Sequence, residues 1–294
     1  MGRPPKLNIQ GMARRDKGLM SCLVADPGYT YVSVDLSSGE PTVTSQYSRD
    51  PRYYAACFGM VGKDPYYDNG ILMIDDIYLM CASASPMGKE AIRKCYDEGV
   101  FDGWNTGEKD YIQKKHPVIG PIRVFHKPLA LGLGYSMGPR KMVRTARDHG
   151  HLITYKDAKA FHTAYWKEIY SDLGLYADKQ QAILKSVGYL VNQFGYRLVP
   201  DSPHKAFNYM IQSSVSGIIN LLDGIFEVLC HNTDLDVTFI TIIHDELIYR
   251  IADKDLAASK KMMDAAVVEL NRILAWDVNI RTGWEEGKTL YEAK

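Results

Sequence analysis

The stretch that decides the fold is Val237-Thr-Phe-Ile-Thr-Ile-Ile-His244-Asp245-Glu246-Leu-Ile-Tyr-Arg-Ile251. Two apolar runs, 237–243 and 247–251, are rich in β-branched residues and predict two buried strands. A histidine and two adjacent carboxylates stand between them. Because a carboxylate that leaves water without a partner costs several kcal/mol or shifts its pKa, this acidic pair indicates a cation, for which a divalent metal ion is the natural candidate. The alternative is an ordinary hairpin with a solvated acidic turn.

A second predicted strand also ends on a carboxylate. The run Tyr29-Thr-Tyr-Val-Ser-Val leads directly to Asp35, and small turn-forming residues then separate Asp35 from Glu40. If the two strands lie side by side in a sheet, Asp35 and Asp245 come together. Paired carboxylates make a hard, oxygen-rich site that suits Mg²⁺, and two ions about 3.5–4 Å apart are the usual arrangement for in-line phosphoryl transfer.

A helix predicted at about 121–136 carries Arg123, Lys127, Leu131 and Tyr135 at intervals of four residues. Residues four apart share a helix face. This face therefore presents two cations, an apolar side chain and a phenol, an order that suits a nucleoside triphosphate lying along the helix. The alternative is a solvated basic face that grades into a buried one.

Pro128 removes a backbone donor inside this helix and predicts a kink or a break. Gly132 and Gly134 are poor helix formers and indicate a close approach at that end. Farther along, Arg140 and Arg144 belong to a basic stripe at helical spacing. Such a stripe is usually a solvated face, but this one would also contact phosphates well.

Pro203 begins a helix that carries His204, Asn208 and Gln212 four residues apart. These side chains suit a DNA minor groove, or they are satisfied inside a core. The remaining patterns predict an irregular segment with a helix at 75–85, a loop at 102–120, one or two helices at 156–184, a hairpin at 188–199, a helix at 255–274 and a short strand at 279–284.

Composition limits the class of protein. The chain has 294 residues, 46% hydrophobic and 24% charged, which suffices for a large core and one or two domains. The five cysteines are odd in number and form no C-x-x-C pair, which indicates the reduced thiols of an intracellular protein. The N-terminus has no apolar signal segment, and the most apolar run, 215–230, is interrupted by Asp223 and Glu227, so no membrane span is expected. A formal net charge of zero argues against coating nucleic acid by bulk charge, but not against a local basic groove.

Taken together, the motifs resemble those of family A DNA polymerases, the bacterial DNA polymerase I and phage replicative enzymes. Asp35-Leu-Ser-Ser-Gly-Glu40 resembles motif A, Arg123-x3-Lys127-x3-Leu131-Gly132-x2-Tyr135 resembles motif B, and His244-Asp245-Glu246 matches motif C. The resemblance implies an α+β fold of right-hand architecture, with an antiparallel palm sheet, mainly helical fingers, and no thumb or exonuclease domain. Its implied domain limits are palm at 1–50, fingers at 51–187 and palm again at 188–294.

The resemblance also implies catalytic and metal-binding roles. Asp35 and Asp245 would be the carboxylates of a site for two Mg²⁺ ions, with Mn²⁺ as a possible substitute and the Leu36 carbonyl as a further ligand. Glu246 would act beside the metals. Lys127 would bind the triphosphate and protonate the leaving pyrophosphate.

Nucleotide and DNA contacts follow from the same resemblance. Arg123 would clamp the triphosphate, while Tyr135 and Leu131 would lie under the sugar with Glu40, which fills the space of a ribose 2′-hydroxyl. His244 would flank the primer terminus. The residues expected to contact DNA are Arg3, Arg140, Arg144, His204, Lys205, Asn208 and Gln212.

Several positions depart from the family pattern. Leu131 stands where Phe or Tyr is usual, which should change sugar discrimination. Ser136 replaces the glycine that normally follows the tyrosine, His204 replaces an arginine, and Pro41 follows Glu40 where a strand former is common. The long stretch between motifs A and B suggests an insertion in the fingers at about 88–120.

The sequence thus predicts a DNA-directed DNA polymerase that transfers nucleotidyl groups from dNTPs to the 3′-hydroxyl of a primer on a DNA template. Because motif A begins at Asp35, the expectation is the polymerase half of a split or truncated enzyme in a bacterial cytoplasm, with a separate protein supplying the thumb, a 3′–5′ exonuclease, or both. One alternative is a single-subunit RNA polymerase, against which Glu40 and Glu246 argue. The other is a non-catalytic DNA-binding subunit, against which the presence of Lys127 and Asp245 argues.

Overall fold

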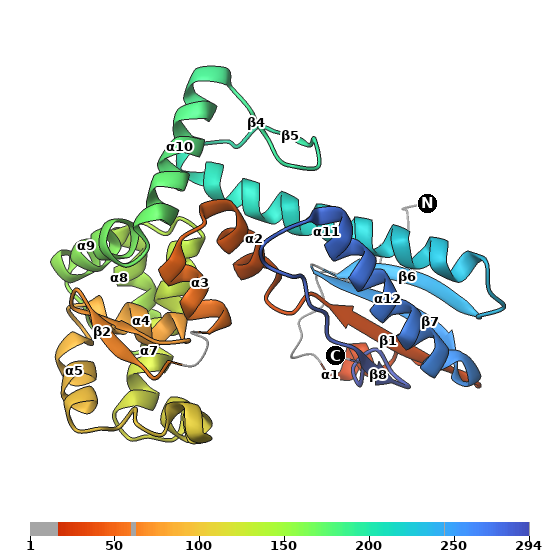
Figure 1. The fold of residues 1–294 in the computed structure, drawn as a ribbon, viewed down its shortest axis with the longest axis horizontal. Helices are drawn as coiled ribbons and strands as arrows, with labels where there is room; N and C mark the ends of the chain where they lie inside the picture. The colour runs from red at the N-terminus through yellow and green to blue at the C-terminus, as the bar shows by residue number, and fades with distance from the viewer. Residues whose placement is uncertain (1–16, 60–62, 244, 294) are drawn as a thin grey trace, which may run out of the picture. The chain divides into compact units, whose positions relative to one another are not determined.

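The computed structural model describes residues 17–59, 63–243 and 245–293. The chain forms two compact units, drawn in Figure 1: residues 1–43 with 212–294, and residues 44–211. After the resemblance described above, we refer to them as the palm unit and the fingers unit. These limits differ from the expected domain limits, because residues 44–50 and 188–211 pack within the fingers unit. The α+β architecture with an antiparallel sheet is as predicted.

The palm unit is built on a four-stranded antiparallel sheet with the strand order β6-β7-β1-β8. β1 (Tyr29–Asp35) pairs with β7 (Glu246–Ala252), and β7 forms the hairpin with β6 (Val237–Ile243). The two apolar runs and the segment before Asp35 therefore form strands as predicted. The first run is not the buried strand that was expected, because β6 lies at the edge of the sheet and leaves Phe239 and Ile240 exposed. β1 lies directly beside β7, so Asp35, the first residue of motif A, lies opposite Glu246 at the start of the second motif C strand.

The fourth strand corrects one prediction. A strand was expected at 279–284, but β8 (Glu285–Gly287) forms after that segment and pairs with residues 31–33 of β1. Within the expected range, Thr282 makes only an isolated bridge to Leu36. The apolar residues Val278 and Ile280 are buried in the core, so their alternation reflects packing rather than strand pairing.

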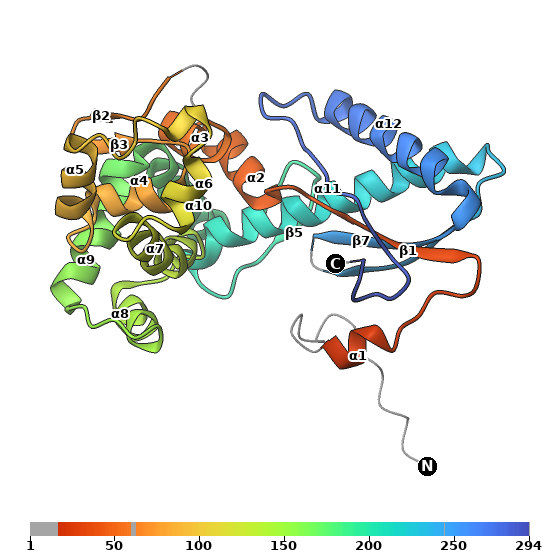
Figure 2. The same ribbon diagram turned by 90° about the horizontal axis from the view of Figure 1, so that it is seen from below.

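Two long helices cover one face of this sheet, α11 (Ala206–His231), which begins in the fingers unit, and α12 (Leu256–Leu274); Figure 2 shows them on the same side of the strands. The ring of Phe226 packs edge-on against Tyr249 at 5.0 Å. The Tyr249 hydroxyl donates a 2.6 Å hydrogen bond to Asp223. Asp223 and Tyr249 thus satisfy each other's hydrogen-bonding groups at the interface between helix and sheet.

The short helix α1 (Lys17–Ser21) lies on the other face of the sheet. A small apolar cluster joins it to the strands and to the C-terminal segment: Met20, Ile243, Ile248 and Leu290. Both faces of the central strands are therefore buried, which explains why β7 reads as an almost continuous apolar run.

Among the described residues, one helical stretch, 203–231, is long and apolar enough to cross a membrane by length and composition. The core helix of a folded protein passes the same test. The palm half of this stretch packs against the sheet through Phe226, as a core helix does.

The fingers unit is mainly helical. Its helices are α2 (Gly39–Ser48, which starts in the palm unit), α3 (Pro51–Phe58), α4 (Ile77–Ala84), α5 (Lys89–Asp97), α6 (Lys109–Lys114), α7 (Ile119–Gly134), α8 (Pro139–Asp148), α9 (Tyr155–Ala164) and α10 (Ser171–Val187). Short hairpins pair β2 (Tyr66–Asp68) with β3 (Ile71–Met73) and β4 (Leu190–Val191) with β5 (Arg197–Leu198). Single turns are η2 (Trp104–Thr106), the π-helical η3 (Tyr165–Ile169) and η4 (Pro203–Lys205), with η5 (Asp253–Asp255) in the palm unit.

The structure corrects one expectation about the fingers and narrows another. The segment 102–120 is not a plain loop, because the buried side chains of Trp104 and Ile112 anchor the turn η2 and the helix α6. Pro128 does not end the motif B helix, since α7 continues through it to Gly134. Burial of Leu129 and Leu133 on the same helix offsets the one hydrogen bond that the proline removes. The predicted hairpin at 188–199 and the helices at 75–85, 156–184 and 255–274 form close to their expected limits.

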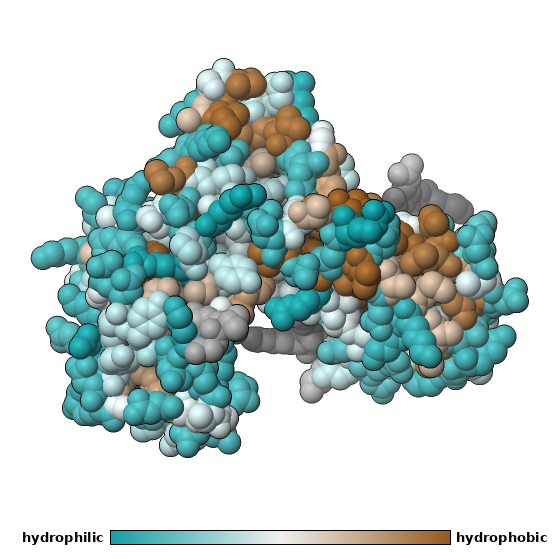
Figure 3. Space-filling model, in the orientation of Figure 1, coloured by the Kyte–Doolittle hydropathy of each residue, from teal (hydrophilic) through white to brown (hydrophobic). Residues whose placement is uncertain are grey.

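Exposed apolar side chains gather over the β4–β5 hairpin, as Figure 3 shows. Val187, Val191 and Val199 are each more than half exposed there.

Candidate active site

Two carboxylates stand at the ends of adjacent palm strands. Asp35 is the last residue of β1 and lies opposite Glu246 in the register of β1 and β7. Asp245 directly precedes β7, and its carbonyl accepts a 3.2 Å hydrogen bond from the backbone N–H of Leu36. This pairing brings the backbones of Asp35 and Asp245 to the same end of the sheet.

Among the residues that the structure describes, the candidate metal ligands at this end of the sheet are oxygens. Asp35 and Asp245 are partly buried, and within the described part of the chain no side chain donates a hydrogen bond to either carboxylate. The Leu36 carbonyl accepts a long 3.3 Å bond from Gly39 and keeps a second lone pair. Carboxylate and carbonyl oxygens without a protein cation fit Mg²⁺ or Mn²⁺. No set of three His, Cys, Asp or Glu side chains gathers as a ready-made metal site among the described residues.

Glu246 is placed differently from Asp35 and Asp245. Its side chain is only 4% exposed, and its carboxylate accepts a hydrogen bond from the Ser33 hydroxyl. Burial and this bond favour a role in holding the strands and the neighbouring Asp245. Ser33 was not among the predicted site residues, although the two-residue period of a strand puts it on the same face as Asp35.

Glu40 and Gln212 contact each other. Glu40 lies in the first turn of α2, and its carboxylate accepts a 2.6 Å hydrogen bond from the Gln212 side-chain amide on α11. The sequence assigned Glu40 to the sugar and Gln212 to DNA as separate functions. No local pattern links them, because they are 172 residues apart.

The predicted face of the motif B helix forms in α7. Lys127 is exposed, and Leu131 and Tyr135 are 44% and 47% exposed. The opposite face of the helix carries Phe125 and Leu129, which are buried. The amphipathic pattern therefore leaves a cation, an apolar side chain and a phenol in line on the exposed side.

Arg123 departs from this exposed row. Its Nε forms a 2.5 Å ion pair with Asp76, whose side chain is 1% exposed. The same Asp76 oxygen accepts a 2.7 Å hydrogen bond from Gln113, and the other oxygen caps α4 through the N–H groups of Tyr78 and Leu79. Arg123 thus uses one of its five N–H donors to bind Asp76, and its terminal amino groups take no part in that ion pair.

Tyr78 lies beside both cations of the motif B helix. Its ring centroid is 5.0 Å from the guanidinium carbon of Arg123 and 5.8 Å from the Lys127 ammonium. Sequence reasoning missed Asp76, Gln113 and Tyr78. The one local signal was an Asp immediately before an apolar helix, which predicts an N-cap but not the ion pair with Arg123.

His126 is packed on the buried face of α7. Its side chain is fully buried, and Nδ1 lies 2.8 Å from the Ile122 carbonyl. Within the described residues Nε2 has no hydrogen-bond partner. Burial lowers the pKa of His126 to about 4, so the imidazole is neutral in the folded protein.

The residues predicted to contact DNA are scattered over several elements. Lys205 forms a 2.7 Å ion pair with Asp201, which competes with any phosphate. The others that the structure describes are exposed or partly exposed: Arg140 and Arg144 on α8, His204 in η4, and Asn208 and Gln212 on α11. Arg3 and His244 lie outside the described residues.

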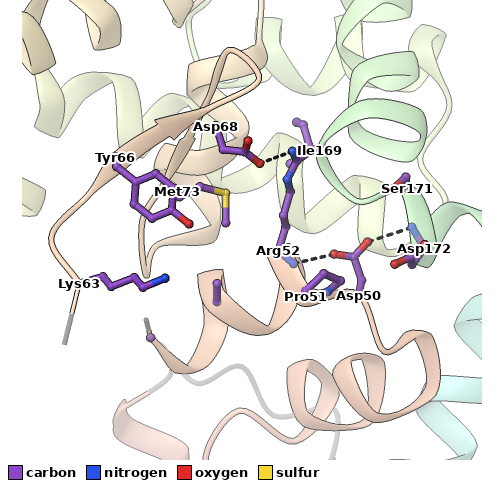
Figure 4. Close-up of a pocket in the computed structure, with 12 residues that line it drawn as sticks. Asp50, Pro51, Arg52, Lys63, Tyr66, Asp68, Met73, Ile169, Ser171 and Asp172 are labelled. Atoms are coloured by element: carbon purple, nitrogen blue, oxygen red, sulfur yellow. Dashed lines mark hydrogen bonds and ion pairs between the residues drawn. The ribbon is translucent and has the colours of Figure 1, made fainter. Parts of the chain in front are cut away.

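A cavity of 690 Å³ in the fingers unit is lined by none of the predicted site residues (Figure 4). Asp50 lies at its wall, and its two oxygens cap two helices at once, α3 through Arg52 and Tyr53 and α10 through Asp172 and Leu173. Burial, opposed by these backbone hydrogen bonds, raises the pKa of Asp50. Arg52 and Asp68 in the wall form a 2.7 Å ion pair, and Asp50 is bound to backbone N–H groups, which indicates a structural role for these three residues.

The geometry can be compared with known proteins. The chain is 20% identical over 276 residues to DNA polymerase I of Aquifex aeolicus, covering 93% of this chain and 41% of that protein. It is 21% identical over 270 residues to the DNA polymerase of Escherichia phage T5, covering 83% of this chain and 28% of that protein. The fold matches the polymerase domain of Pol1 from M. smegmatis, solved with a DNA primer–template and dNTP, with a TM-score of 0.71 at 17% identity over 97% of this chain and 45% of that one. The chain has the fold of a family A DNA polymerase.

The family A resemblance predicted from motifs A, B and C is thereby confirmed for the fold and for the sequence similarity. No protein-family model matches the chain. The chain spans less than half the length of the relatives described above.

Two positions near the end of the motif B helix, Ser136, which departs from the family A pattern, and Gly132, which matches it, have structural consequences. Ser136, at the place of the usual glycine, adopts a left-handed backbone with φ 59°, a conformation that favours glycine. The close approach predicted at Gly132 is made by the side chain of Met137, which a Cβ at position 132 would overlap.

Proposed function

We propose that this chain carries the nucleotidyl-transfer centre of a DNA polymerase, extending a primer on a DNA template. The observation that carries the proposal is the pairing of β1 with β7, which holds Asp35 and Asp245 at one end of the sheet with no protein cation among the described residues to neutralise them. The fold match to a polymerase domain solved with primer–template and dNTP supports it. Because the chain spans only part of its relatives, the activity itself is proposed.

Asp35, Asp245 and the Leu36 carbonyl would hold two Mg²⁺ ions, for which Mn²⁺ is the natural substitute. When bound, the ions would lower the pKa of the primer 3′-hydroxyl and offset the charge on the leaving pyrophosphate. Glu246, buried and bound to Ser33, would fix the β7 end on which Asp245 stands. It acts as a positioning residue.

The motif B face would bind the incoming nucleotide. Lys127 would bind the triphosphate and give a proton to the pyrophosphate as it leaves. The terminal amino groups of Arg123 would contact phosphate while Asp76 holds its Nε. Tyr135 and Leu131 would pack against the sugar and base.

Selection of deoxynucleotides is assigned to Glu40. A carboxylate in the space of a 2′-hydroxyl would exclude ribonucleotides, and Gln212 holds Glu40 by a 2.6 Å hydrogen bond. Arg140, Arg144, His204, Lys205 and Asn208 would contact DNA, mainly through phosphates. A partner that supplies a thumb or an exonuclease, and a bacterial cytoplasmic setting, stay predictions.

The test is primer extension on a short primed template with Mg²⁺, once with dNTPs and once with rNTPs. Incorporation of dNTPs that is lost in Asp35→Asn and retained in Asp172→Asn, an exposed acid of the fingers unit, supports the proposal. Preferential use of rNTPs would favour an RNA polymerase. Binding of primer–template without incorporation under any of these conditions would favour a non-catalytic DNA-binding subunit.

A further inference from the structure

The C-terminal segment runs directly along the end of β1. The N–H of Ser37 donates a 2.8 Å hydrogen bond to the Arg281 carbonyl, Thr282 bridges Leu36, and the N–H of Gly283 donates a 2.9 Å bond to the Asp35 carbonyl. β8 then continues the pairing toward the other end of β1. The backbone beside the motif A carboxylate is therefore supplied by residues 281–283.

Gly283 has no room for a side chain, and the reason is Asp35. A Cβ built on Gly283 would overlap Oδ1 of the Asp35 carboxylate. The backbone of Gly283 is not in the left-handed region, so glycine is not required there for conformational reasons. The space that a Cβ would take is the space that the carboxylate uses.

Other restraints on Asp35 are few. Within the described residues no side chain donates a hydrogen bond to its carboxylate. Its partner in the strand register, Glu246, is bound to Ser33. The backbone at Gly283 is thus a close contact that limits where the Asp35 carboxylate can turn.

We propose that Gly283 is a positioning residue for Asp35, and that the C-terminal segment sets the orientation of this carboxylate toward the metal ions. The inference rests on the function proposed above. It adds to that function a residue that lies outside motifs A, B and C. An added methyl group at position 283 pushes Asp35 into another rotamer, because the flexible end of a side chain yields before two hydrogen-bonded backbones do.

The experiment compares Gly283→Ala with Gly224→Ala. Gly224 lies on α11 in the same palm unit, and a Cβ there meets nothing within 4 Å. Binding of Mn²⁺ is measured by electron paramagnetic resonance, and primer extension is measured over a series of Mg²⁺ concentrations. For Gly283→Ala we expect weaker Mn²⁺ binding, a higher Mg²⁺ requirement and a kcat reduced about 10- to 100-fold, with DNA affinity unchanged. Gly224→Ala should match the parent in Mn²⁺ binding, Mg²⁺ requirement, kcat and DNA affinity.

A second variant separates positioning from a simple packing defect. In Asp35→Ala the overlapping carboxylate is gone, so adding Gly283→Ala should cost no further stability and no further Mn²⁺ affinity. If Gly283→Ala alone fails to fold, the double variant should fold, and failure of both overturns the proposal. Parent-like Mn²⁺ binding and Mg²⁺ dependence in Gly283→Ala would also overturn it. Because Mn²⁺ binding and unfolding are measured without turnover, a parent protein that extends no primer would contradict the proposed function while leaving this comparison readable.

Discussion

The side-chain amide of Gln212 donates a 2.6 Å hydrogen bond to the carboxylate of Glu40. The bond connects α11 to the first turn of α2, so the side chain proposed to exclude ribonucleotides is held from outside its own motif. A carboxylate held in one position fills space more selectively than one that is free to rotate.

Gln212→Ala should therefore weaken discrimination against ribonucleotides. A hydrogen bond to a charged group is worth roughly 1.5–3 kcal/mol when buried and less when exposed, and this bond is exposed, so we expect the ratio of kcat/KM for a dNTP over the matching rNTP to fall by up to about tenfold. Single-nucleotide incorporation kinetics give this ratio. Asn208→Ala, one helical turn away on α11, is the control and should weaken DNA binding without changing the ratio. An unchanged ratio in Gln212→Ala would contradict the claim that Gln212 positions Glu40.

Asp76 should be one of the most sensitive positions for folding of the fingers unit. Removing one partner of a buried ion pair typically costs about 3–5 kcal/mol, and Asp76→Ala removes the cap of α4 as well. We expect a loss of stability in that range, measured by urea unfolding. Asp178→Ala breaks an exposed ion pair with Lys167 and should change stability little. Equal effects of the two substitutions would contradict the buried-pair interpretation.

Ser136→Gly should stabilise the protein. Left-handed backbone costs an ordinary residue roughly 1–2 kcal/mol, and Ser136 has φ 59°, so the free energy of unfolding should rise by about 1 kcal/mol. Ser186→Gly, inside α10, should instead lower it by about 0.5–1 kcal/mol, because glycine weakens a helix. A loss of stability in both variants would show that the Ser136 side chain makes a stabilising contact that outweighs its backbone strain.

His126 should make stability depend on pH. Its pKa is lowered to about 4 from an ordinary 6.5 by burial, so between these values the unfolded chain binds more protons than the folded one. The stability that the shifted pKa of His126 contributes to the folded protein is complete above pH 6.5. It is lost as the pH falls toward 4, and the total loss is about 3 kcal/mol. Urea unfolding of the parent and His126→Leu at pH 7.5 and pH 5 measures this. The parent should lose more stability than the variant on acidification; equal losses would mean that His126 is not buried as a neutral side chain.

Sequence periodicity predicted the strands and the helix face that carry the candidate site. It did not predict the contacts that distant segments make within the site. The alternating and β-branched runs gave β1, β6 and β7, and the spacing of four gave the exposed face of α7 with Lys127 and Tyr135, because both depend on neighbouring residues only. The ion pair of Arg123 with Asp76 and the closeness of Gly283 to Asp35 depend on tertiary packing. A sequence without an alignment carries no signal for such pairs.

The misplaced elements have a related cause. α6 was missed because its sequence is polar and only Ile112 is deeply buried, so the apolar stripe of a short helix reduces to one residue. The strand expected at 279–284 was displaced because Val278 and Ile280 pack into the core instead of pairing. In both cases packing against the rest of the unit, rather than local propensity, decides the element.

The central claim is that Asp35 and Asp245 form a metal-dependent nucleotidyl-transfer centre. The most direct measurement is extension of a short primed DNA template by the purified chain with dNTPs, in Mg²⁺ and in EDTA, for the parent and for Asp245→Asn. The account predicts incorporation of nucleotides by the parent in Mg²⁺, none in EDTA, and none by Asp245→Asn, which should still bind the primer–template in a fluorescence anisotropy titration. Incorporation by Asp245→Asn at the parent rate would contradict the account.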